Sequence, residues 1–175
     1  MIPPEGMVER LHRLDVLFER NPIYFVTACT HSRRKILANP DIHQLFLEFA
    51  ACGPAHGAWL GAYVLMPDHL HAFVSLGHPD LPRQTGHEPS KAAPLLLGTW
   101  MKSLKNSISK GLREIKIGAP HWQKGFFDHV LRSGESFSEK WDYVRNNPVR
   151  AGLVKHPDDW PYSGQVFPLE FRSEA

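Results

Sequence analysis

Two histidines separated by a single residue, His69 and His71, carry the strongest chemical signal in this sequence. The run around them is apolar and β-branched, which predicts a strand in which residues two apart point to the same face. Two imidazoles would then stand side by side and could bind a metal ion. With 11 histidines in 175 residues, about 0.7 such pairs arise by chance, so the pair needs support from the rest of the chain.

A phenol and an amide lie close together nearer the end of the chain. Tyr143 and Asn147 are four residues apart in a segment that predicts a helix from residue 133 to about 147, closed by Pro148. This spacing puts the two side chains on one helix face, one turn apart, as a nucleophile and an amide oxygen. The alternative is that Tyr143 is a packed aromatic and Asn147 a C-terminal cap.

The elements that must position these residues alternate along the chain. Strands are predicted over residues 23–30, 58–76 with a break at 66–68, and 122–131; helices are predicted between Asn39 and Gly53, over 95–112, and over 133–147. This order predicts a ferredoxin-like α+β fold with an antiparallel sheet of about four strands, helices on one face and a C-terminal tyrosine-bearing helix. We expect one domain over residues 1–175, with a core of about 22–163 and a flexible loop at 77–94.

Composition predicts a soluble, unsecreted protein. No stretch approaches the roughly 20 apolar residues of a membrane span, and the first residues lack a charged segment followed by an apolar one. Cys29 and Cys52 have no disulfide-framework or zinc-site spacing, which fits a reducing cytoplasm. The formal charge of +2 is only mildly basic, so nucleic-acid binding depends on local clusters.

Basic and aromatic side chains suggest where a nucleic acid could bind. The candidate phosphate contacts are Arg33, Arg34 and Lys35 after the first predicted strand, and Lys102 and Lys105 on the second predicted helix. A solvated charged surface explains any one of them equally well. Four tryptophans could stack on bases, although core packing is the more common role: Trp100, Trp122, Trp141 and Trp160. Asp128 and His129, on the last predicted strand, are candidate partners of the metal site.

Three motifs in a fixed order resemble those of a known family. They are Met66-Pro-Asp-His-Leu-His-Ala-Phe-Val74, Trp122-Gln-Lys-Gly-Phe-Phe-Asp-His-Val-Leu-Arg132 and Tyr143-Val-Arg-Asn-Asn-Pro-Val-Arg-Ala-Gly-Leu-Val154. Together they resemble the single-tyrosine HUH transposases, most closely the branch of REP-associated tyrosine transposases that act at bacterial repetitive extragenic palindromes. The resemblance runs from about residue 24 to residue 163 and so covers most of the chain.

The resemblance implies a role for each candidate residue. His69 and His71 would be metal ligands, Asn147 the third ligand and Tyr143 the nucleophile. Insertion-sequence relatives often carry Gln at the third position, one methylene longer, which leaves direct ligation and ligation through water both open for Asn147. Two imidazoles and one amide oxygen form a neutral, open set that favours Mg²⁺ or Mn²⁺ over a closed zinc site.

The implied reaction is metal-dependent cleavage of single-stranded DNA near hairpins. Attack by Tyr143 would leave a 5′-phosphotyrosine and a free 3′-hydroxyl. Because this product keeps the energy of a phosphodiester, another 3′-hydroxyl can displace the tyrosine, which permits strand transfer. The implied partner is a REP-like palindrome in the bacterial nucleoid, bound by a monomer or a homodimer with its site in one chain or across two.

Two other functions remain open from the residues alone. One is a non-catalytic nucleic-acid-binding module built on the same sheet, although the exposed-aromatic motif of RNA-recognition domains is absent. The other is a metal-dependent phosphoesterase in which His69 and His71 hold a hydrolytic metal. Only the transposase hypothesis requires Tyr143.

Overall fold

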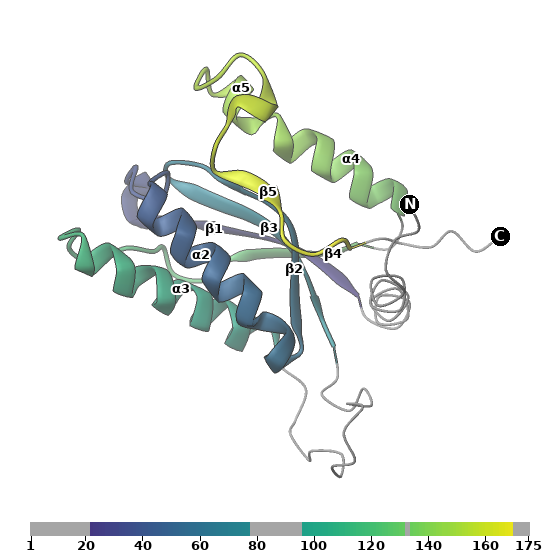
Figure 1. Cartoon of the computed structure of the whole chain (residues 1–175), viewed down its shortest axis with the longest axis horizontal. Helices are drawn as coiled ribbons and strands as arrows, with labels where there is room; N and C mark the ends of the chain where they lie inside the picture. The colour runs from purple at the N-terminus through teal and green to yellow at the C-terminus, as the bar shows by residue number, and fades with distance from the viewer. Residues whose placement is uncertain (1–21, 78–95, 132–133, 170–175) are drawn as a thin grey trace, which may run out of the picture.

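The chain forms a five-stranded antiparallel sheet with helices on both faces, in a computed structural model that describes residues 22–77, 96–131 and 134–169 (Figure 1). The strands are β1 (Ile23–Cys29), β2 (Ala58–Leu65), β3 (His69–Leu76), β4 (Phe127–Leu131) and β5 (Ser163–Gln165), in the order β4-β1-β3-β2-β5. The main helices are α2 (Pro40–Cys52), α3 (Leu97–Glu114), α4 (Gly134–Arg145) and α5 (Asn147–Arg150). The predicted α+β class is confirmed, with one strand more than expected.

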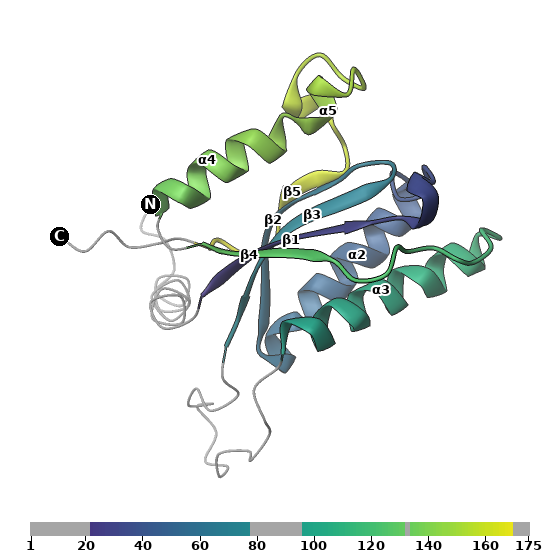
Figure 2. The ribbon, with the colours of Figure 1, turned by 180° about the vertical axis from the view of Figure 1, so that it is seen from behind.

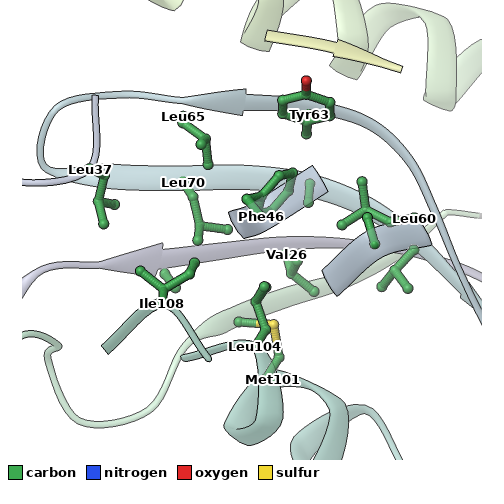
Figure 3. Packing of buried hydrophobic residues seen from close by; sticks show 14 of the residues in the cluster. Val26, Leu37, Phe46, Leu60, Tyr63, Leu65, Leu70, Met101, Leu104 and Ile108 are labelled. Carbon is green, nitrogen blue, oxygen red and sulfur yellow. The ribbon is translucent and has the colours of Figure 1, made fainter. Parts of the chain in front are cut away.

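Helices α2 and α3 cover one face of the sheet. Helix α2 begins at Pro40, where a missing N–H costs nothing, and the Asn39 side chain caps it by accepting from the Asp41 backbone N–H at 2.8 Å. Alternation along β3 turns Leu70 toward this side, where the cluster of fully buried side chains includes Phe46 of α2 (Figure 3). This layer is the main core of the protein.

Helix α4, which carries Tyr143, lies on the face of the sheet opposite to α2 and α3 (Figures 1 and 2). Helix α4 packs on Phe73 of β3, which is fully buried. The ring centroid of Phe73 lies 4.7 Å from that of Phe137 and 6.1 Å from that of Trp141. Residues two apart on a strand share a face, so His69 and His71 point to this same side. The sheet face that carries the histidines is therefore the face on which α4 packs.

The helix that carries Tyr143 is shorter than the sequence predicted. It ends at Arg145, and after a turn at Asn146 the short helix α5 begins at Asn147. Pro148 explains the break, because it has no N–H to donate and its ring collides with the carbonyl four residues earlier. Tyr143 and Asn147 therefore lie on two consecutive helices and not on one.

Segments at the two edges of the sheet also differ from expectation. β5 pairs with β2 through Ser163 and Val64, and the Trp160 indole N–H donates to the Leu65 carbonyl at 3.0 Å, so the segment 160–165 packs back against the sheet. The strand predicted over residues 122–131 is shorter in the structure, because β4 begins at Phe127. Trp122 forms only an isolated bridge to Thr30, the residue after β1. Apart from its first residue, the predicted loop at 77–94 lies outside the described residues. Within the described ranges, no helix is long and apolar enough to cross a membrane.

Candidate metal and nucleophile site

The two histidines lie side by side at the beginning of β3, an inner strand of the sheet. Their ring centroids are 4.8 Å apart and their planes are close to perpendicular, at 83°. Each side chain is partly exposed, whereas Leu70 between them is fully buried on the opposite face. The strand and the shared face that the His-x-His spacing predicted are both present.

A partner side chain holds each imidazole through its Nδ1 atom. His71 Nδ1 lies 2.7 Å from the hydroxyl of Thr27, which sits directly opposite it in the β1–β3 register. His69 Nδ1 donates to a carboxylate oxygen of Asp68 at 2.6 Å. With Nδ1 engaged, Nε2 is the nitrogen of each ring that is left to bind a metal, and such outer hydrogen bonds fix the tautomer and orientation of ligating histidines. These partners are Thr27 and Asp68 and not Asp128 or His129.

The surroundings of His71 keep its imidazole neutral. Burial is the largest cause of a pKa lowered to about 3, followed by the neighbouring His69 and three cations: Arg150, Arg33 and Lys140. The neutral imidazole is the form that binds a metal, because the protonated ring has no free lone pair. The face is also positively charged, which suits an anionic ligand.

Arg33 stands behind Asp68 and completes a chain of contacts that ends at His69. Its Nε lies 3.0 Å from Asp68 Oδ2, and its Nη1 lies 2.9 Å from the sulfur of Cys29. The turn that carries it uses left-handed backbone at Ser32, φ 51°, and at Arg33, φ 55°. Arg33, which the sequence suggested as a phosphate contact, is thus paired with the carboxylate that orients a histidine.

Tyr143 is exposed on α4, with 63% of its surface accessible, so it is not the packed aromatic of the alternative interpretation. The Arg150 guanidinium carbon lies 3.9 Å from the centroid of the Tyr143 ring, and Arg150 Nη1 donates to the Tyr143 carbonyl at 2.7 Å. Arg150 Nη2 donates to the side-chain oxygen of Asn147. One arginine therefore connects the two residues that the sequence suggested as nucleophile and third ligand.

The remaining basic candidates divide into two groups. Arg34 donates to two backbone carbonyls in the 118–120 segment, and Lys105 donates to two in the 123–125 segment while lying over the Trp122 ring. These two side chains fasten the connection between α3 and β4. Lys35 and Lys102 are exposed, and neither lies in the cluster around the histidines.

The tryptophans pack against the protein, and another aromatic is exposed. Trp100 is only 4% accessible, and the other three are partly buried against the two cores: Trp122, Trp141 and Trp160. Phe127 of β4 is 58% exposed and pairs with Thr27, so it points to the same sheet face as His71. Sequence reasoning missed Phe127, Thr27 and Asp68, of which Asp68 alone carried a local signal, its position next to His69.

The donor set limits how a metal could be held. In the part of the chain that the structure describes, no group of three or more His, Cys, Asp or Glu side chains could hold a metal ion. His69 and His71 supply two nitrogens, and the Asp68 carboxylate is engaged with His69 and Arg33. The residues present fit an open site of two imidazoles, to which Asn147 or the substrate would add oxygen ligands.

Comparison with known proteins agrees with the motifs. No family model matches the chain. A putative REP-associated tyrosine transposase of Haemophilus influenzae is 25% identical over 151 residues, covering 83% of this chain and 81% of that protein. A REP-associated tyrosine transposase of Escherichia coli K12 is 27% identical over 111 residues, covering 59% of this chain and 52% of that protein. An uncharacterized protein of Haemophilus influenzae is 26% identical over 94 residues, 50% of this chain and 52% of that protein, so the match spans about half the length of this relative and of the Escherichia coli one.

A solved structure extends the similarity to the fold. The structure of a REP-associated tyrosine transposase bound to a REP hairpin superposes with a TM-score of 0.56 at 21% identity, covering 87% of this chain and 86% of that one. The fold is that of this class of transposase. The chain is related to the REP-associated tyrosine transposases, as its three motifs predicted.

Proposed function

We propose that this protein is a metal-dependent transposase that cuts single-stranded DNA beside a REP-like hairpin through Tyr143 and rejoins it by strand transfer. The observation that carries the proposal is the pair His69 and His71, each tied through Nδ1 so that Nε2 is available, on the sheet face where α4 packs. The similarity to REP-associated tyrosine transposases, one of them solved with a REP hairpin bound, supports a REP-like hairpin as the substrate.

The proposed site combines two imidazoles, an amide and a phenol. His69 and His71 would hold Mg²⁺ or Mn²⁺ with Asn147 as the third protein ligand, and the ion would polarise the scissile phosphate as a Lewis acid. The Tyr143 oxygen bonds to phosphorus while the bond from phosphorus to the 3′ oxygen breaks. The phenolic proton is lost and the 3′ oxygen gains one, which leaves a 5′-phosphotyrosine and a 3′-hydroxyl.

Exposure and packing around Tyr143 agree with this role. A nucleophile that attacks a polymer must be reachable from solvent, and the Tyr143 side chain is largely exposed. The helix that carries it is fixed to the sheet by Phe137 and Trp141, on the face to which the histidines point. A hydrolase that used only the histidine pair would have no need of an exposed tyrosine on the helix that packs on this face.

The test is covalent capture of labelled DNA. Purified protein is incubated with Mn²⁺ or Mg²⁺ and single-stranded oligonucleotides that contain the palindromic repeats flanking its gene. We expect a protein–DNA adduct that withstands SDS and is absent from Tyr143→Phe. Tyr24→Phe is the matched control, because Tyr24 packs against the α2/α3 core on the other face and should leave the adduct unchanged.

The other outcomes separate the rival functions. Cleavage that persists in Tyr143→Phe would identify a phosphoesterase and reject the tyrosine mechanism. Tight hairpin binding without an adduct, whichever of the two metals is present, would favour a binding module or an inactivated transposase.

A further inference from the structure

Arg150 is the side chain that joins the two halves of the α4–α5 region. Its guanidinium lies against the Tyr143 ring and donates to the Tyr143 carbonyl and to the side-chain oxygen of Asn147. These contacts reach back across the break at Asn146, from the last residue of α5 to the last turns of α4. The guanidinium thus stands between the residues proposed as nucleophile and third ligand.

The positive charge of Arg150 has no carboxylate to balance it in the described ranges. Its two hydrogen-bond partners there are neutral oxygens, whereas Arg145 is paired with Asp158 and Arg33 with Asp68. The Arg150 side chain is exposed.

This combination is typical of an anion-binding arginine. A guanidinium has five N–H donors, and the contacts above use two of them. The remaining donors can form the paired hydrogen bonds that arginine makes to phosphate oxygens. Arg150 lies over the face of the Tyr143 ring, 3.9 Å from its centroid, so a phosphate attacked by the phenolic oxygen of the same ring would approach within reach of this guanidinium.

We propose that Arg150 binds the scissile phosphate beside Tyr143 and is a further catalytic residue of the site. This inference rests on the proposed function for the identity of its ligand, the backbone phosphate of a single DNA strand. The guanidinium would balance the negative charge that grows on the phosphate oxygens during attack. Its contact with Asn147 would hold the amide oxygen in place before DNA binds.

The first test measures the rate of adduct formation at saturating DNA. Removing one preorganised donor to a developing oxyanion slows enzymes by roughly 100- to 1,000-fold, and we expect a loss of that order in Arg150→Ala. Arg150→Lys keeps the charge without the planar fork and should recover part of the rate. Arg145→Ala is the matched control, because Arg145 lies in the last turn of α4 and pairs with Asp158, so it should retain the wild-type rate.

The second test needs no cleavage and separates phosphate binding from a structural role. In the Tyr143→Phe background, binding is measured for two oligonucleotides, one natural and one with a neutral methylphosphonate at the cleavage position. Removing the phosphate charge should weaken binding when Arg150 is present and have little effect in Arg150→Ala. If Arg150 only supports the α4–α5 connection, Arg150→Ala should weaken the binding of both oligonucleotides equally.

Several results would overturn the inference. An Arg150→Ala protein that forms the adduct at the wild-type rate would exclude a catalytic role. A faster rate would mean that Arg150 restrains Asn147, the opposite of the proposal. If wild type forms no adduct, the proposed function fails. The comparison is then made with the methylphosphonate at each linkage beside the hairpin in turn, and it still decides whether Arg150 binds a phosphate.

Discussion

Asp68 is the residue whose removal should most directly disturb the histidine pair without touching a proposed ligand. Its carboxylate accepts from His69 Nδ1 at 2.6 Å and pairs with Arg33 at 3.0 Å, while only 22% of the side chain is accessible. Asp68→Asn keeps the size and leaves a neutral acceptor, whereas Asp68→Ala leaves none. Loss of such outer partners lowers metal affinity about 10- to 100-fold, roughly 1.4 to 2.8 kcal/mol.

We expect Asp68→Asn near the lower end of that range and Asp68→Ala near the upper end. The assay is a Mn²⁺ titration followed by electron paramagnetic resonance of the free ion, on Tyr143→Phe protein bound to a hairpin oligonucleotide so that no cleavage intervenes. Arg33→Met should have a smaller effect, because Arg33 acts on His69 only through Asp68. The double variant should lose little more than Asp68→Asn alone.

Asp158→Asn provides the control, because Asp158 also pairs with an arginine, Arg145, at a largely exposed site away from the histidines. Its Mn²⁺ affinity should equal that of the parent protein. Wild-type affinity in Asp68→Ala, or an equal loss in Asp158→Asn, would refute the argument that Asp68 orients a metal ligand.

Two further predictions follow from the packing on the two faces of the sheet. Because Phe137 and Trp141 fix α4 to Phe73 of its own chain, we expect a site completed within one chain, so a mixture of His69→Ala and Tyr143→Phe proteins should form no adduct; an adduct in the mixture would show that two chains share the site. On the other face, burial raises the pKa of Tyr63 to about 12 from its usual 10.0. The folded state therefore holds the phenolic proton more tightly than the unfolded chain, and the stability that this provides is complete below about pH 10 and is lost as the pH rises toward 12. In urea unfolding, the free energy of unfolding should fall less between about pH 10 and pH 12 in Tyr63→Phe than in the wild type. An identical pH dependence in both proteins would contradict the raised pKa of Tyr63.

Local patterns predicted most of the elements that carry the site. Alternation around His69 and His71 indicated the strand and the shared face, and Asn39 with Pro40 indicated where α2 begins. Pro148 correctly indicated that a helix must end before it. These features depend on neighbours within a few residues, which is the range over which sequence patterns determine backbone conformation.

Features that depend on distant pairing were not predictable in the same way. Thr27 supports His71 only because the β1–β3 register places them opposite each other across 44 residues. The side of the sheet that α4 covers depends on how Phe137 and Trp141 meet Phe73, and an amphipathic helix gives no sign of which face it will choose. β5 escaped notice because it has three residues, one of them Gly164, and carries no periodic pattern.

The proposed metal ligands lie on a rigid strand of the sheet, and the proposed nucleophile lies on the exposed surface of a helix. His69 and His71 lie on an inner strand with hydrogen-bonded neighbours on both sides, and two partner side chains fix their rings. Tyr143 instead lies on the exposed surface of a helix that packs on the sheet through other side chains, Phe137 and Trp141 among them. In the proposed reaction, the metal would need ligands held within fractions of an ångström, which favours the sheet, whereas Tyr143 would need a position that a DNA strand can enter and leave. Arg150 connects the two parts of the site. It lies on the short helix after the break, its guanidinium contacts Tyr143 and Asn147, and its charge contributes to the lowered pKa of His71.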